Sequence, residues 1–174
     1  MEYSPGNHHV TLRPMVLEDI EQVIAIDTIS FSMPWSRKSY RFELTENPTA
    51  ALWVAESNLS GDQGRIVGMI ATWFVINEVH IATIAVHPDY RRQGIGARLL
   101  ARGILHSAEK GATVAMLEVR RTNLGAQALY RWFGFTVVGF RPRYYHDNNE
   151  DALLMNLHPL SIDFLRQIDR GKAE

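Results

Sequence analysis

The chain has 174 residues, of which 46% are hydrophobic, and this is enough apolar material for one compact domain with a substantial core. Lys and Arg together number 18 against 19 Asp and Glu, so the formal net charge of -1 excludes a global basic field that would hold nucleic acid or an anionic membrane. The lack of cysteine excludes disulfides, thiolate nucleophiles and cysteine-based metal sites, and it fits the reducing cytoplasm, where we expect this protein.

The first half of the chain predicts a strand, two helices and an antiparallel meander of three strands. Apolar residues at helical spacing follow the first strand, and the segment Phe31-Ser-Met-Pro-Trp35 separates the two helices. Ser36 is the expected N-cap of the second helix, which stops at Asn47-Pro48. The predicted ranges are a strand over 10–13, a helix over 17–29, and strands over 51–57, 65–76 and 78–86.

The second half predicts two strand-loop-helix units and a final pair of strands. A charged loop with glycines follows His87-Pro88, and Gly134 ends the second helix. The predicted ranges are helices over 95–109 and 123–133, a strand over 114–119, and strands over 135–140 and 152–157 around the polar loop 145–151. We therefore predict a mixed α/β domain over residues 1–158, and a weakly helical C-terminal extension over 159–174.

The loop Arg91-Arg92-Gln93-Gly94-Ile95-Gly96 lies directly between a predicted strand and a predicted helix. A helix N-terminus has unsatisfied N–H groups and partial positive charge, so a phosphate can bind there. Glycines allow close approach and positive φ, and the arginines can add charge-assisted hydrogen bonds. The sequence thus suits a diphosphate, although the same letters also fit an ordinary solvated turn. Neither a P-loop nor a Rossmann fingerprint is present.

Just before this loop, the apolar phase of the strand changes parity, from Val79 and Ile81 to Ile84 and Val86. An extra residue in a β-bulge would produce such a change. A sheet covered on both faces would also accept apolar residues at either parity. Both interpretations stay open from the sequence.

The segment from Ile84 to Ala97 resembles motif A of the GNAT acetyltransferases, whose pyrophosphate loop pattern is met here by Arg91, Gly94 and Gly96. Leu117-Glu-Val-Arg-Arg-Thr-Asn123 and Ala128-Leu-Tyr-Arg-Trp-Phe-Gly-Phe135 are similar to the next strand and helix of that superfamily. The resemblance implies its fold, a central, mostly antiparallel sheet with helices on both faces.

Within the superfamily, the chain resembles the ribosomal-protein-S18 alanine N-acetyltransferases. This likeness rests on Phe31-Ser-Met-Pro-Trp35-Ser36, the Glu-Val-Arg-x-x-Asn block, Arg143-Tyr144-Tyr145, and Glu150-Asp151-Ala152 with Met155. Asn148-Asn149 replaces a frequent glycine, and the extension from Leu160 is longer than usual. Both departures from the family pattern bear on which acceptor substrate is used more than on the acetyl-transfer reaction.

Acetyl-CoA is the cosubstrate that the resemblance implies. Backbone groups of the strand would bind its pantetheine arm, and the glycine loop would bind its diphosphate. Asn123 would contact the cofactor or simply cap a helix. The implied cofactor residues are Ile84, Ala85, Val86, Arg91, Arg92, Gln93, Gly94, Ile95, Gly96, Ala97 and Asn123.

Glu118 and Tyr130 are the catalytic residues that the resemblance implies. Glu118 would take a proton from the incoming ammonium, directly or through water, and Tyr130 would protonate the departing thiolate. The residues alone leave other interpretations open: Glu118 pairing with Arg120 or Arg121, and Tyr130 packing beside Phe133. No covalent enzyme intermediate is required.

The expected acceptor is the N-terminal amine of a protein, by resemblance that of ribosomal protein S18. Pro34, Trp35, Tyr144 and Tyr145 would line its groove, or merely pack. A GNAT enzyme acting on a small amine or a lysine side chain, and a CoA-binding module without turnover, are the alternatives.

No membrane or metal partner is predicted. Residues 1–13 lack the apolar core of a signal peptide, and no stretch approaches about 18 uninterrupted apolar residues. The seven histidines show no pair at metal-binding spacing. The four tryptophans are dispersed among apolar segments, which favours core packing over base stacking.

Overall fold

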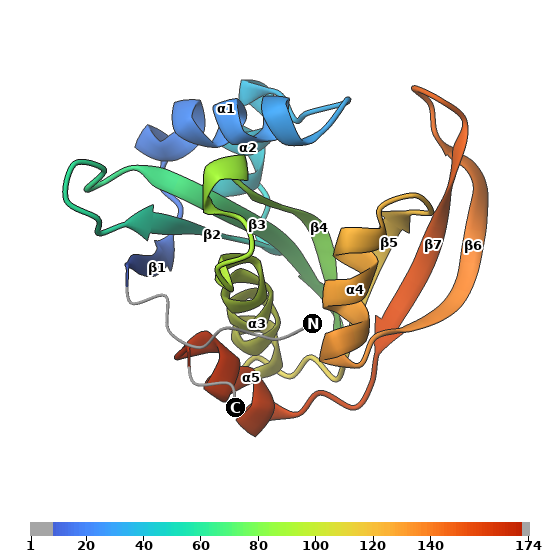
Figure 1. Cartoon of the computed structure of the whole chain (residues 1–174). Helices are drawn as coiled ribbons and strands as arrows, with labels where there is room; N and C mark the ends of the chain where they lie inside the picture. The colour runs from blue at the N-terminus through green and yellow to red at the C-terminus, as the bar shows by residue number, and fades with distance from the viewer. Residues whose placement is uncertain (1–8, 172–174) are drawn as a thin grey trace.

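The computed structural model describes residues 9–171 and contains one sheet of seven strands. These strands are β1 (Val10–Pro14), β2 (Ala50–Ser57), β3 (Ile66–Val75), β4 (Glu78–Val86), β5 (Val114–Arg120), β6 (Thr136–Tyr145) and β7 (Glu150–Leu157). Their order across the sheet is β1-β2-β3-β4-β5-β7-β6, and each neighbouring pair is antiparallel except β4 with β5 (Figure 1).

Helices cover both faces of this sheet, which confirms the predicted fold class (Figure 1). One face packs against α1 (Ile20–Ser30) and α2 (Arg37–Thr45). The other face packs against α3 (Ile95–Ala108), α4 (Leu124–Phe133) and α5 (Ile162–Asp169). Two short 3-10 turns, η1 (Leu17–Asp19) and η2 (Pro88–Tyr90), precede α1 and α3. No helix in residues 9–171 is long and apolar enough to cross a membrane.

The central strand β3 is buried on both faces. Val67 and Ile70 belong to the core on the α3 side, whereas Ile66 and Met69 belong to the core on the α1 side. All four side chains are at most 2% exposed. Successive residues of a strand point to opposite faces, and residues three apart share a face here because Val67 is an extra residue, between the pairs that β2 makes with Gly68 and Ile66. An almost continuous apolar run is what a strand between two helical layers requires.

Local signals in the sequence fix several helix ends. The Ser36 hydroxyl accepts a hydrogen bond from the Ser39 N–H (3.1 Å), so the predicted N-cap of α2 is confirmed. Gly134 has φ 98° and ends α4 in the left-handed conformation that glycine adopts without strain, which confirms the predicted stop.

The predicted strand ends near the final hairpin were wrong. β6 continues to Tyr145 and β7 begins at Glu150, so the polar loop shrinks to residues 146–149. Tyr145 pairs with Glu150, and the register shifts between Arg141 and Tyr145. The polar sequence of residues 141–151 did not indicate strands. β6 is an exposed edge strand, and such a strand can pair without alternating apolar residues.

The segment after Pro159 is more ordered than its weak patterning predicted. Ser161 caps α5, and Leu165 and Ile168 are at most 1% exposed in the core against α3. Arg102 of α3 forms a bidentate ion pair with Asp169 (2.7 Å to each oxygen). Residues 1–8 and 172–174 of the predicted ranges lie outside the described residues.

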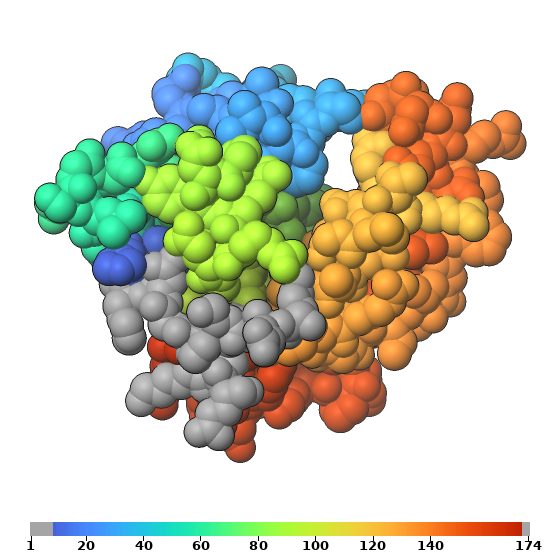
Figure 2. Space-filling view, viewed as in Figure 1, coloured from blue at the N-terminus to red at the C-terminus, as the bar shows by residue number. Residues whose placement is uncertain are grey.

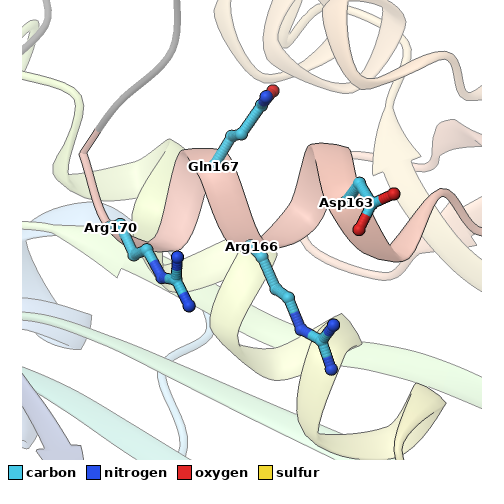
Figure 3. A pocket seen from close by; sticks show the side chains of 4 residues that line it. All are labelled: Asp163, Arg166, Gln167 and Arg170. Carbon is cyan, nitrogen blue, oxygen red and sulfur yellow. The ribbon is translucent and has the colours of Figure 1, made fainter.

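The outer side of α5 carries a shallow polar surface. Asp163, Arg166, Gln167 and Arg170 border a cavity of about 450 Å³. Figure 3 shows Arg166 pointing toward α3, where its guanidinium lies 3.7 Å from Glu109. Arg166 thus links the two helices, and this surface lies apart from the main cleft.

Candidate active site

The parallel strands β4 and β5 separate halfway along their length. They pair from Glu78 with Val114 to Ile81 with Leu117, and the described sheet has no further pair between them. At that point β4 contains an extra residue, Ala82, since β3 pairs with Ile81 and then with Thr83. Of the two interpretations that the sequence left open, the bulge is therefore confirmed. Beyond it the β5-facing backbone of β4 is left without a strand partner, which opens the sheet.

This opening is a cleft of about 980 Å³. Figure 2 shows the molecule hollowed between the green segment with the start of α3 and the yellow to orange segment with α4. Most predicted site residues line it: Trp35, Ile84, Ala85, Val86, Arg91, Arg92, Gly94, Ile95, Gly96, Ala97, Glu118, Asn123, Tyr130, Tyr144 and Tyr145. The lining does not include Pro34 or Gln93, whose side chains are exposed elsewhere.

The glycine loop presents an uncapped helix start to the cleft. Gly94, the N-cap residue of α3, has φ 79° and makes no side-chain capping bond to the first N–H groups of the helix. Arg91 donates to the Val86 carbonyl oxygen (2.9 Å), so this guanidinium braces the loop against β4. A Cβ at Gly96 would meet only ordinary contacts, the nearest being Val86 Cγ2 at 3.7 Å. The protein's own packing thus does not demand this glycine, whereas a phosphate approaching the backbone would.

Glu118 lies on β5, on the arm of the cleft opposite the glycine loop, with 27% of its side chain exposed. Its nearest cation is the Arg141 guanidinium, at 3.7 Å. Arg120 pairs instead with Asp147 (2.9 Å), and Arg121 approaches Asp151 (3.8 Å). The pairing of Glu118 with Arg120 or Arg121 that the sequence left open is therefore not found.

Helix α4 supplies two further residues to the cleft. Asn123 caps it by accepting from the Ala126 N–H (3.1 Å), so the capping interpretation holds, and the residue also borders the cleft. Tyr130 is 5% exposed and contacts the ring of Phe135 (5.8 Å between centroids) rather than Phe133. Burial raises the pKa of the Tyr130 hydroxyl well above its usual value, so it stays protonated at neutral pH.

Aromatic side chains surround the other end of the cleft. Trp35 stacks on Trp73 (6.2 Å between centroids), and Tyr144 contacts Tyr145 edge to face (5.1 Å). Burial raises the pKa of Tyr145 to about 12. Trp35 comes from the segment before α2, and Tyr144 and Tyr145 come from β6; the fold brings these three rings together at the cleft.

A buried carboxyl supports the segment that carries Trp35. Asp27 is fully buried and accepts from the Tyr40 hydroxyl (2.6 Å) and from the Trp35 N–H (3.2 Å), both through Oδ2. Its Oδ1 has no partner among the described residues, and burial raises the pKa of Asp27. Tyr40 is likewise fully buried. Through these two hydrogen bonds, the Asp27 carboxyl links α1 to α2 and to the segment that contains Trp35.

We expect Tyr40→Phe to lower the free energy of unfolding by about 1–3 kcal/mol, because a buried carboxyl loses one of its hydrogen-bond donors. Urea denaturation measures this change. Tyr144→Phe, at a side chain that is 40% exposed, is the matched control and should stay within about 0.5 kcal/mol. Equal stability of both variants would contradict this account of Asp27.

Sequence reasoning assigned no role to Arg120, Ser32, Asp147 or Glu150, yet all four border the cleft. Ser32, Arg120 and Glu150 stand within segments that carry the family resemblance, and that was the only signal in the sequence. The histidines and carboxylates of residues 9–171 form no group of three or more that could hold a metal ion.

Comparisons with known proteins agree with this geometry. Residues 20–135 match the family described as "Acetyltransferase (GNAT) family". A Bacillus subtilis (strain 168) protein, provisionally named as a ribosomal protein bS18-alanine N-acetyltransferase, is 41% identical over 144 residues, covering 83% of this chain and 92% of that protein.

Two solved structures have similar folds. The crystal structure of the ribosomal-protein-S18-alanine N-acetyltransferase from Escherichia coli has a TM-score of 0.76 at 30% identity, covering 87% of this chain and 95% of that chain. The NatC complex bound to Gag peptide and CoA contains a chain with a TM-score of 0.78 at 25% identity, covering 88% of this chain and 99% of that chain.

Proposed function

The chain belongs to the GNAT family of acetyltransferases and is an N-acetyltransferase, and from this premise we propose that it acetylates the N-terminal amine of a protein with acetyl-CoA. The observation that carries the proposal is the cleft between β4 and β5. One arm holds a helix start suited to a diphosphate, and the other holds a carboxylate and a buried phenol. The acceptor is the N-terminal alanine of ribosomal protein bS18, as the names of the similar proteins suggest.

The chemistry of the residues that line the cleft suits acetyl-CoA. The edge of β4 at Ile84, Ala85 and Val86 has no partner strand on the side of β5, and apart from the Val86 carbonyl oxygen, which Arg91 binds, it offers hydrogen-bonding groups to the amide-rich pantetheine arm. The uncapped start of α3 with Gly94 and Gly96 offers N–H groups to the diphosphate. When bound, acetyl-CoA supplies an acetyl group activated as a thioester.

Two protons must move, and two residues of the chain can move them. Glu118 accepts a proton from the acceptor ammonium, directly or through water, so that a neutral amine is available for attack. Tyr130 donates its phenolic proton to the departing sulfur, and its raised pKa keeps that proton in place beforehand. Both side chains border the same cleft.

An N-terminal amine places a lighter demand on the base than a lysine does. The reference pKa of an α-amine is about 7.7–8.0, whereas that of lysine is about 10.4. At neutral pH the α-amine is therefore neutral in a far larger fraction of molecules. Trp35, Tyr144 and Tyr145 would line the groove for the first residues of the acceptor. Pro34, outside the cleft, would act only by shaping the Trp35 segment.

Matched peptides test this proposal. We expect an Ala-first peptide to be acetylated with a kcat/KM at least about 10²-fold above that of the same peptide with a blocked N-terminus and an internal lysine, as the pKa difference predicts. Mass spectrometry of the products locates the label. Equal labelling of the blocked peptide would exclude N-terminal specificity. Comparing protein N-termini in cells with and without the enzyme then identifies the natural acceptor.

A further inference from the structure

Two segments far apart in the sequence meet across the acceptor end of the cleft. Ser32, after α1, donates a hydrogen bond from its hydroxyl to Asp147 in the turn between β6 and β7. Both residues border the cleft. Figure 2 shows the blue and orange segments in contact above the hollow, and Figure 1 shows the loop after α1 reaching toward the β6–β7 turn. The contact bridges the two walls of the opening.

Arg120 holds this bridge together from the end of β5. One guanidinium nitrogen donates to both carboxylate oxygens of Asp147 (3.0 and 2.9 Å) and to the Ser32 hydroxyl (3.2 Å). The other terminal nitrogen donates to Asn148 (3.1 Å) and Glu150 (3.2 Å). The planar cation also lies 3.9 Å from the centroid of the Tyr145 ring. A guanidinium supplies several donors in a fixed plane, which a lysine ammonium does not.

The acceptors of Arg120 are themselves fixed and ionised. Glu150 accepts from the N–H (2.8 Å) and hydroxyl (2.5 Å) of Thr122, and these bonds, with others, lower the pKa of Glu150 to about 2. The bonds from Ser32 and Arg120 lower the pKa of Asp147. Both carboxylates therefore carry charge at neutral pH, and without a cation between them they would repel each other.

We propose that Arg120 is a positioning residue that fixes the acceptor end of the cleft, by locking the β6–β7 turn onto the segment after α1 and by holding the ring of Tyr145. The acceptor then meets a preformed site and does not pay for ordering it. The identity of the acceptor rests on the proposed function above, whereas the lock itself is a property of the fold. The bonds of the Arg120 guanidinium go to this end of the cleft, away from the glycine loop.

Arg120→Gln tests the proposal, with Arg121→Gln as the matched control. Arg121 is the next residue, its side chain is 72% exposed, and its one ion pair among the described residues is a long one, 3.8 Å to Asp151. Arg121→Gln therefore makes the same change in charge and leaves the contacts of Arg120 with Ser32, Asp147 and Glu150 in place. Arg120→Lys keeps the charge and loses the planar donors. Ser32→Ala is milder, since it removes the link between the two segments and keeps every charge.

In Arg120→Gln we expect the KM for the Ala-first peptide to rise about tenfold or more, with kcat within about threefold and acetyl-CoA affinity unchanged by calorimetry. Backbone amides of residues 144–149 should exchange with deuterium faster. Arg120→Lys should resemble Arg120→Gln, Ser32→Ala should show a smaller effect of the same kind, and Arg121→Gln should match the wild type.

Unchanged exchange at residues 144–149 in Arg120→Gln would overturn the proposal, and so would an unchanged peptide KM. Full rescue by Arg120→Lys would also overturn it, because charge alone would then suffice. If the wild-type enzyme fails to acetylate the peptide, the proposed acceptor is wrong, and the exchange measurement still decides whether Arg120 forms the lock.

Discussion

Tyr130→Phe is expected to lower kcat by about 10²-fold or more, with acetyl-CoA still bound at wild-type affinity. The substitution removes only the hydroxyl, the group that we propose donates a proton to the departing sulfur. The phenylalanine ring keeps the contact with Phe135, now 5.8 Å between centroids, so little stability should be lost. Steady-state kinetics and calorimetric titration with acetyl-CoA measure the two quantities.

The pH dependence of the wild-type enzyme adds a second check. Burial raises the pKa of Tyr130, and the protonated form is the one that acts as the acid. The activity that depends on this proton is therefore lost only as pH rises through the raised pKa, above the usual value of about 10. Turnover of Tyr130→Phe at the wild-type rate would remove Tyr130 from the mechanism.

Glu118→Gln is expected to lower kcat at neutral pH by a similar factor, about 10²-fold or more. The amide has nearly the shape of the carboxylate but cannot take the proton from the acceptor ammonium. Above about pH 8 the α-amine is mostly neutral without help, so the deficit of the variant should shrink as pH rises through that value. Rate profiles of both enzymes with the Ala-first peptide measure this ratio.

Glu78→Gln is the matched control for Glu118. Glu78 lies at the start of β4, where that strand still pairs with β5, and within residues 9–171 the cation partner of its carboxylate is His80, at 3.3 Å. Its kcat should remain within about threefold of the wild type at every pH. If the kcat of Glu118→Gln is lowered by the same factor at every pH, Glu118 does not act as the base. The lower kcat would then result from a change in local packing or charge.

Local signals predicted much of the fold because each depends on neighbours in the sequence. Ser36 and Gly134 act through their own turn of helix, and the change of parity around Ala82 marks an extra residue that interrupts the regular pleat of the strand. The glycine loop belongs to the same class, since a helix start after a strand is readable from a dozen residues.

Predictions failed where distant segments decide the structure. The β6 strand extends to Tyr145 because β7 supplies its partner, and α5 is ordered because α3 offers an apolar surface to Leu165 and Ile168. Neither segment carries a strong pattern of its own. Packing and pairing energies override weak local preference in such places.

By itself, the sequence determined the order of elements, the family resemblance and the placing of Glu118 and Tyr130 on adjacent elements. Only the tertiary structure decided which cation each carboxylate meets. Glu118 and Arg120 point to the same side of β5, yet Arg120 is bound by Asp147 and Glu150, and Ser32 reaches Asp147 across 115 positions of the chain. The partner of a charged side chain depends on distance in space, and hydrophobic periodicity does not record that distance.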